Sequence, residues 1–265
     1  LSNTFVRRVH AVLQAALKQA VKERLIPYNP CENCRIPPKD KKEMTILPPE
    51  KIGRYLQEAE KYGVLPMFYL ELSSGLRRGE LLALRWEDLN VKERILTVNK
   101  QVTRMEGELD VTEPKTKNSV RKVALSQQAV DLLVQEHEQH PDNPILFPSP
   151  RTGGYWSPDA VSRINRKLLK SAGIEEHVRF HDLRHTFATM AISSGVDVKT
   201  LSSMLGHYSA GFTLDTYTHI TNDMQRGAAE KIGGFMETVT ATTTPEPPDP
   251  PEESRCKVIP FEKVV

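Results

Sequence analysis

The sequence lacks the features that mark membrane-spanning, secreted and disulfide-bonded proteins. No stretch reaches the roughly 18 consecutive apolar residues that a helix needs to cross a bilayer. The first residues also lack the basic-then-apolar pattern of a secretory signal. Three cysteines, an odd number in 265 residues, do not make a disulfide framework. We therefore expect a protein of the reducing cytoplasm with no membrane partner.

Net charge is small as well, at +2, but its distribution is uneven. Residues 1–45 carry nine Lys and Arg against four Asp and Glu, whereas residues 238–265 carry three against five. Residues 46–237 are almost neutral, with 24 against 25. A basic first segment before a neutral body permits contact with nucleic acid but does not require it.

The spacing of apolar residues predicts a mainly helical chain with a small antiparallel β-sheet, an α+β fold. Strands are expected over residues 95–98 and 120–125, with Glu106-Gly107 supplying a turn between them. Helices are expected over residues 4–26, 48–62, 65–74, 78–84, 127–138, 157–171, 181–193, 197–205, 212–218 and 222–235.

Composition divides the chain into four parts. Residues 1–26 form one amphipathic helix, which cannot bury its apolar stripe alone and so indicates a helical domain whose earlier part is absent. The four prolines and many charges that follow predict a linker over residues 27–44. Residues 45–237 then form the main folded domain. Residues 238–265, rich in Thr, Pro and acid, are expected to be a disordered tail.

One predicted helix start gathers basic side chains. His181, Arg184 and His185 have the i, i+3, i+4 spacing that puts them on one face. Free N–H groups, the positive end of the helix dipole and charged donors together favour an anion. A basic surface helix start, or a histidine satisfied in the core, explains the same pattern equally well.

Three further residues, Arg77, Lys115 and Tyr217, are ordinary when each is taken alone. Arg77 follows a glycine at a helix start, and Glu80 one turn later is placed to orient its guanidinium. Such an arginine is usually solvated, as is a turn lysine such as Lys115. A tyrosine beside apolar helix residues, such as Tyr217 ten residues after His207, usually packs in a core or at its rim.

Their joint order, Arg, Lys, His-x-x-Arg, His, Tyr, resembles the tyrosine recombinase family, in particular phage and conjugative-transposon integrases. Gly-Leu-Arg-x-Gly-Glu-Leu-Leu-x-Leu-x-Trp-x-Asp-Leu lies at 75–89, and Pro-Lys-Thr-x-x-Ser-x-Arg-x-Val-x-Leu at 114–125. Phe-His-Asp-Leu-Arg-His-Thr-Phe-Ala-Thr lies at 180–189, and Leu-Gly-His followed by Thr-Leu-Asp-Thr-Tyr-x-His at 205–219. The resemblance covers roughly residues 4–237.

The resemblance implies transesterification at phosphorus, through a 3′-phosphotyrosyl link, without metal or cofactor. By this resemblance Tyr217 is the nucleophile, and Arg77 and Arg184 bind the phosphate oxygens. Lys115 is the general acid, with Lys117 as the rival candidate, and His181 is the general base. His207 would hydrogen-bond the phosphate, and Glu80 and His185 would support the site.

The resemblance also implies partners and missing parts. It predicts a bacterial, nucleoid-associated enzyme that acts on double-stranded attachment or core sites and integrates or excises a mobile element. A homotetramer is expected in the synaptic complex and a monomer in isolation, with accessory directionality and DNA-bending proteins as further partners. An arm-binding domain and most of a core-binding domain would be absent. The segment 208–213 departs from the family pattern, and its Gly211 could loosen the stretch that carries Tyr217.

Other interpretations compete with strand transfer at defined sites. A type IB topoisomerase shares the chemistry and would relax supercoils without choosing a sequence. A non-catalytic DNA-binding module is the alternative from another class, while a histidine phosphatase leaves Tyr217 and Lys115 without roles. Cys31-x-x-Cys34 could be half of a zinc site, but no second pair follows and Cys256 lies in the tail, so no metal is expected.

Overall fold

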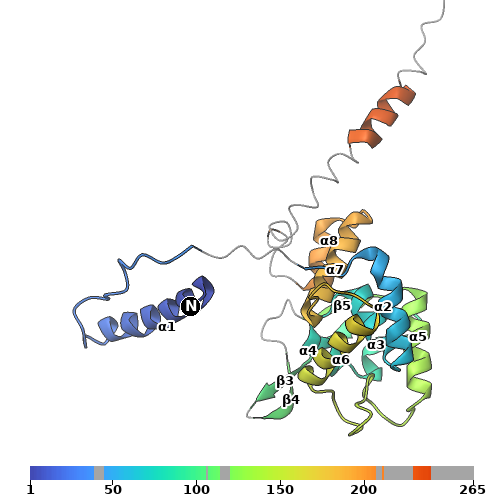
Figure 1. The fold of residues 1–265 in the computed structure, drawn as a ribbon, viewed down its shortest axis with the longest axis horizontal. Helices are drawn as coiled ribbons and strands as arrows, with labels where there is room; N and C mark the ends of the chain where they lie inside the picture. The colour runs from blue at the N-terminus through green and yellow to red at the C-terminus, as the bar shows by residue number, and fades with distance from the viewer. Residues whose placement is uncertain (39–44, 106, 114–119, 207–210, 212–228, 240–265) are drawn as a thin grey trace, which may run out of the picture.

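The computed structural model describes residues 1–38, 45–105, 107–113, 120–206, 211 and 229–239. Helix α1 (Asn3–Lys22) begins where the Ser2 side chain accepts a hydrogen bond from the Phe5 N–H at 3.2 Å. The helix expected over 4–26 is confirmed but ends earlier, since residues 23–26 form turns and bends. Residues 27–38 contain no helix or strand, in line with a proline-rich connection (Figure 1).

The main body starts with three helices whose bounds follow the sequence prediction closely. They are α2 (Pro49–Lys61), α3 (Leu65–Ser74) and α4 (Arg78–Ala83). Proline in the first turn of α2 and α3 suits a position where a backbone N–H would have no partner inside the helix. Gly75 ends α3 in the left-handed conformation, at φ 60°.

The predicted β-region forms two sheets rather than one. Strands β1 (Leu89–Asn90), β2 (Ile95–Val98) and β5 (Arg121–Ala124) make an antiparallel sheet in the order β1-β2-β5, in which Leu96 faces Val123. This confirms the pairing of the two expected strands. The chain between them forms a separate hairpin of β3 (Gln101–Met105) and β4 (Glu108–Thr112), which projects from the body in Figure 1. Glu106, in the expected turn, lies outside the described residues.

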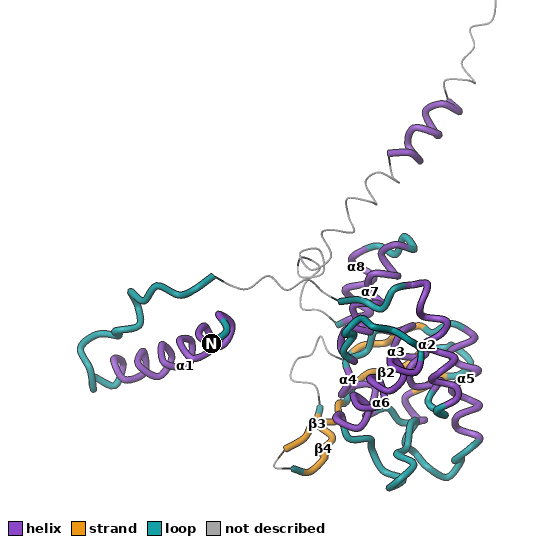
Figure 2. The backbone as a smooth tube through the Cα atoms, in the orientation of Figure 1, coloured by secondary structure: helices purple, strands orange, loops and turns teal. Residues whose placement is uncertain are grey.

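Four more helices complete the described body, and each matches an expected one (Figure 2). They are α5 (Gln127–Glu138), α6 (Pro158–Ser171), α7 (Phe180–Ser193) and α8 (Val198–Leu205). The core centres on α3, which packs against α2, α5 and α7. There the Phe68 ring meets Tyr55 and Phe180 edge-on, with centroids 5.8 and 5.7 Å apart. Aromatic contacts of this kind add to the burial of apolar surface.

Residues 229–239 are helical, so the last part of the helix expected over 222–235 is present and reaches Val239. Its expected first part, residues 222–228, lies outside the described residues. Residues 238 and 239, the first two of the predicted tail, are helical, and residues 240–265 lie outside the described residues. The apolar side chains of this stretch are exposed. The helix expected over 212–218 lies outside the described residues. Among the helices that the structure describes, none is long and apolar enough to cross a membrane.

Candidate active site

Two of the predicted catalytic arginines meet at the carboxyl end of α8. Arg77 precedes α4 and donates from Nη2 to the Gly206 carbonyl at 2.8 Å. Arg184, on α7, donates from Nη2 to the Leu205 carbonyl and from Nη1 to the Gly75 carbonyl, both at 2.7 Å. Residues more than 100 positions apart in the sequence are thereby held against one helix end.

Glu80 lies beneath this pair. Its carboxylate accepts from Arg77 twice, from Nη1 at 2.7 Å and from the backbone N–H at 2.9 Å. Burial alone would raise the pKa of Glu80, but the hydrogen bond and charge of Arg121, followed by those of Arg77, outweigh it and lower that pKa. A carboxylate that is 2% exposed is thus kept ionised and fixes the plane of the Arg77 guanidinium.

Arg121 is a site residue that sequence reasoning missed. Its guanidinium pairs with both oxygens of Glu80, at 3.1 and 2.8 Å, and its Nε donates to the Met204 carbonyl at 2.6 Å. The alternation of β5 held the signal, because Arg121 and Val123 are the buried positions of that strand and Lys122 is exposed. A charged residue on the inward face of a strand needs a buried partner.

Three consecutive carbonyls at the end of α8 therefore each bind a different arginine: Met204 binds Arg121, Leu205 binds Arg184 and Gly206 binds Arg77. The carboxyl end of a helix carries partial negative charge, which offsets the repulsion among the guanidinium groups. Gly206, at φ 63°, ends the helix and is the residue before His207 in the sequence.

The two predicted histidines lie side by side at the start of α7. The His181 and His185 rings meet edge-on with centroids 5.2 Å apart. Desolvation, followed by the charge of Arg184, lowers the pKa of the exposed His181. Desolvation and the neighbouring His181 lower the pKa of the half-buried His185 to about 4. Both rings are therefore neutral near pH 7.

Asp182, the acid closest to these histidines in the sequence, pairs with Arg179 and not with either histidine. Arg179 holds it through Nε and Nη2, at 2.9 and 2.8 Å, and through the backbone N–H at 2.7 Å. This capping arrangement fixes the first turn of α7. Arg184, in the next turn, is 3% exposed, and burial followed by the charge of Arg77 lowers its pKa to about 10.

Glu71, on α3, is a second buried acid near the arginines that the sequence did not reveal. It is fully buried, and neither carboxylate oxygen has a hydrogen-bond partner among the described residues. Burial raises the pKa of Glu71 more than the charges of Arg184 and Arg121 lower it. At Glu71 burial thus outweighs the nearby arginine charges, whereas at Glu80 the arginines outweigh burial.

A basic cavity of about 590 Å³ opens beside His181, between α4, α6 and the start of α7. Arg78, which lines this cavity, donates a hydrogen bond from Nη1 to the Ser162 hydroxyl at 2.7 Å. Basic side chains on its wall, next to a helix amino terminus, suit an anionic ligand. The basic residues that line it are Arg78, Arg166, His177, Arg179 and His181.

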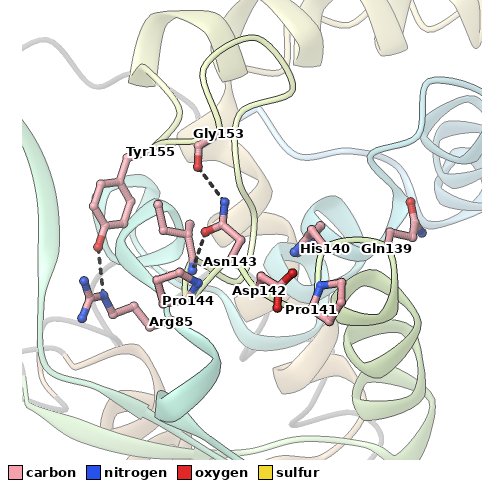
Figure 3. A pocket seen from close by; sticks show the side chains of 10 residues that line it. Arg85, Gln139, His140, Pro141, Asp142, Asn143, Pro144, Gly153 and Tyr155 are labelled. Atoms are coloured by element: carbon pink, nitrogen blue, oxygen red, sulfur yellow. Dashed lines mark hydrogen bonds between the residues drawn. The ribbon is translucent and has the colours of Figure 1, made fainter.

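A second cavity, of about 680 Å³, contains none of the predicted site residues (Figure 3). Hydrogen bonds within its wall join Arg85 to the Tyr155 hydroxyl at 3.2 Å and the Asn143 amide to the Gly153 carbonyl at 2.8 Å. These bonds hold a loop in place. Nothing in this wall supplies a nucleophile and base in contact.

Three predicted residues, Lys115, His207 and Tyr217, lie outside the described residues. The sequence places Lys115 in the connection between β4 and β5, which leads directly into Arg121. His207 comes directly after the Gly206 carbonyl that binds Arg77. The roles of all three remain predictions.

A comparison with known protein families shows which family this chain belongs to. The model of the phage integrase family matches residues 47–224, which is more than half of the chain. The chain belongs to the phage integrase family. It is a tyrosine recombinase, an enzyme of site-specific DNA recombination.

This chain is also similar to individual members of the family. The ICEBs1 integrase of Bacillus subtilis strain 168 is 30% identical over 249 residues, covering 89% of this chain and 67% of that relative. A structure of the Tn1549 transposon integrase with circular-intermediate DNA matches with a TM-score of 0.75 and 22% identity, over 88% of this chain and 80% of that one. A lambda integrase tetramer on a Holliday junction gives a TM-score of 0.57 at 22% identity, over 76% and 58% of the two chains. At such identities the structures establish the recombinase fold alone.

Proposed function

We propose that this recombinase cleaves a DNA strand with Tyr217 and rejoins it during integration or excision of a mobile element. The Tyr217 oxygen attacks the scissile phosphorus, and the bond from phosphorus to the 5′-oxygen breaks. A 3′-phosphotyrosyl link and a 5′-hydroxyl result. The number of phosphoester bonds is unchanged, so rejoining needs no external energy source.

The observation that carries this proposal is the arginine arrangement at the end of α8. Arg184 is buried and Arg77 half-buried, and hydrogen bonds from both Nη atoms of each arginine hold the two guanidinium groups in place. Two planar guanidinium groups held in this way suit the non-bridging oxygens of one phosphate, where charge builds up in the transition state. Arg121 and Glu80 would act as positioning residues beneath them.

Proton transfer is assigned to the remaining members of the set. His181, neutral near pH 7 and exposed, suits the general base toward Tyr217. Lys115, with Lys117 as the rival, would protonate the leaving 5′-oxygen. His207 would hydrogen-bond the phosphate. The half-buried His185 would support His181 through the ring contact.

Double-stranded DNA is the proposed partner. Structures of the Tn1549 and lambda integrases contain DNA, and the basic cavity between α4, α6 and α7 offers this chain a surface for a phosphate backbone. We propose residues 1–26 as the last helix of a core-binding domain, 27–44 as the linker and 45–237 as the catalytic domain. The proposed place of action is the bacterial nucleoid, with directionality and DNA-bending proteins as further partners.

A homotetramer on DNA is proposed as the active assembly. Helical residues 229–239 expose Ile232, Phe235, Met236 and Val239 at the i, i+3, i+4, i+7 spacing of one apolar face. Phe235 alone is 67% exposed, and such a face favours burial against another subunit. Without DNA we expect a monomer.

A covalent-trapping experiment tests the proposal. The full chain is incubated with nicked, labelled duplexes that carry the attachment site, and protein-linked DNA is separated on a denaturing gel. Wild type should trap DNA and Tyr217→Phe should not, while Tyr28→Phe, an exposed tyrosine, serves as the matched control. Trapping by Tyr217→Phe would refute the assignment. Relaxation of any supercoiled plasmid would favour a topoisomerase, and binding without trapping a DNA-binding module.

A further inference from the structure

A histidine and two cysteines meet at the start of the chain, away from the recombinase site. His10 lies on α1, while Cys31 and Cys34 lie in the segment that follows the helix. One ring nitrogen and the two Sγ atoms all lie within 4.8 Å of one another. His10 and Cys31 are half-buried and Cys34 is exposed, so an ion from solvent has access to the group.

Hydrogen bonds hold this segment along one face of α1. The Asn29 amide donates to the Gln14 carbonyl at 3.2 Å, and Arg7 Nη1 donates to the Pro37 carbonyl at 2.8 Å. Between them, His10 Nε2 lies 3.2 Å from the Cys31 carbonyl. Helix positions 7, 10 and 14 share one face, so the segment runs antiparallel to the helix and brings both cysteines to His10.

Hydrogen bonds orient two of the three candidate ligands, Cys31 and His10. Asn29 is buried, and its Oδ1 accepts from the Cys31 N–H at 2.9 Å, which anchors the start of the Cys-x-x-Cys turn. A carbonyl oxygen can only accept a hydrogen bond, so His10 Nε2 carries the proton in its contact with Cys31. Nδ1 then keeps the lone pair. Histidines that ligate metals commonly donate their other N–H to a backbone carbonyl in this way.

We propose that His10, Cys31 and Cys34 bind one Zn²⁺ ion, with water in the fourth tetrahedral position. Zn–S distances of about 2.3 Å and Zn–N distances of about 2.0–2.1 Å place the ligand atoms of a tetrahedral site about 3.5–3.8 Å apart. Since the ligand atoms lie within 4.8 Å of one another, the group has to close by no more than about 1 Å. Two thiolates and an imidazole favour Zn²⁺ over Ca²⁺ or Mg²⁺. Both thiol protons pass to solvent on binding.

The sequence concealed this site because its third ligand is not near the other two. Cys31 and Cys34 form a common zinc half-site, and no second pair of the same kind follows them. His10 is separated from Cys31 by more than half of α1 and a turn, and only the return of the chain along the helix unites them. The ion would fasten the first part of the connection to α1 and limit the directions in which the chain leaves it.

Metal binding to the whole 265-residue chain tests the proposal. The purified protein is titrated with Co²⁺ as a spectroscopic probe, and zinc is counted by mass spectrometry after dialysis against a weak chelator. We expect one ion per chain and the visible bands of tetrahedral, thiolate-bound cobalt. Cys31→Ser and Cys34→Ser should abolish those bands. His10→Gln should weaken binding by more than the roughly 10–100-fold that loss of an outer-shell partner costs.

Two controls keep the result interpretable. Cys256→Ser should still bind one ion, as should His140→Gln, which changes a histidine of the main body. Circular dichroism checks that the helices persist in every variant. Hydrogen exchange of the backbone amides of residues 28, 29 and 31–34 should slow with Zn²⁺ in wild type but not in Cys31→Ser.

Three results would each overturn the proposal. The first is a chain that holds no zinc when thiols are kept reduced. The second is unchanged cobalt spectra in the Cys31→Ser/Cys34→Ser double variant. The third is a Cys31–Cys34 disulfide that forms readily and persists when Zn²⁺ is present. In that case the pair would be a redox element and not a metal ligand set.

Discussion

Arg77 and Arg184 donate to consecutive carbonyl oxygens, those of Gly206 and Leu205, at 2.8 and 2.7 Å. Neither arginine therefore depends on a bound phosphate for its orientation. A site whose donors are already aligned loses little energy to reorganisation when charge develops in the transition state.

Arg77→Lys should slow covalent trapping by about 10²–10³-fold, because lysine keeps the charge but not the planar fork. The half-exposed position should leave the free energy of unfolding almost unchanged. Single-turnover cleavage of a nicked duplex measures the rate, and urea denaturation measures stability. Arg151→Lys makes the same change at an exposed loop position and should cleave at the wild-type rate. Equal cleavage rates in Arg77→Lys and Arg151→Lys would show that Arg77 does not bind the phosphate.

Arg121→Met should destabilise the fold by about 3–5 kcal/mol, since it leaves the buried Glu80 carboxylate without its main partner. Adding Glu80→Gln should recover part of that loss, because the stranded charge is removed. A double-mutant cycle by denaturant unfolding gives the coupling energy between the two residues. A coupling energy near zero would mean that the ion pair does not hold the arginine cluster together.

Gly75→Ala should destabilise the chain more than Gly63→Ala does. Both glycines have positive φ, 60° and 66°, so alanine costs about 1–2 kcal/mol at either position. At Gly75 the added methyl also overlaps Phe187 and Leu205, whereas at Gly63 nothing lies within 4 Å. Overpacking of this kind adds about 1–3 kcal/mol. Urea unfolding of the pair measures the difference, and equal losses would contradict the overlap.

The fold should lose stability as the pH is lowered, because His185 has a lower pKa in the folded chain than in the unfolded one. Its pKa is about 4 in the folded chain and about 6.5 in an unfolded one. As pH falls from about 6.5 to about 4, the unfolded state takes up a proton that the folded state does not, so stability is lost in that window. We expect a loss on the order of 1–2 kcal/mol, allowing for solvent around a half-buried ring.

His185→Gln should flatten the pH dependence over that window, measured as midpoint temperature at a series of pH values. His177→Gln, which changes an exposed histidine, should keep the wild-type profile. Identical slopes in wild type and His185→Gln would show that other groups cause the loss.

Local sequence signals predicted most of the helices because each helix end is a local event. Proline at the start of α2 and α3, and the left-handed Gly75 at the end of α3, mark boundaries that depend on a few neighbouring residues. The antiparallel pairing of β2 with β5 followed in the same way from alternation in two short strands, although the sequence did not give its register. The separate β3–β4 sheet could not be predicted in this way, because the same alternation of apolar residues fits one sheet or two.

Contacts between distant segments were beyond reach of those signals. Arg121 binds Met204 and His10 lies beside Cys31, and neither contact leaves a pattern within either stretch of sequence. The sequence named Arg77, Arg184 and Glu80, but not Arg121 or the carbonyl oxygens at the end of α8. Glu71 shows the same limit, since an acid in an apolar helix is ambiguous until its neighbours are known.

The end of α8 has a consequence for anyone who wishes to transplant this chemistry. Its three carbonyls contact arginines from three separate stretches of chain, so the smallest portable unit includes the backbone of α8 as well as the side chains. Grafting Arg77, Arg121 and Arg184 onto another scaffold without that helix end would bring together three cations that repel one another. Any redesign has to begin with the helix and add the arginines afterwards.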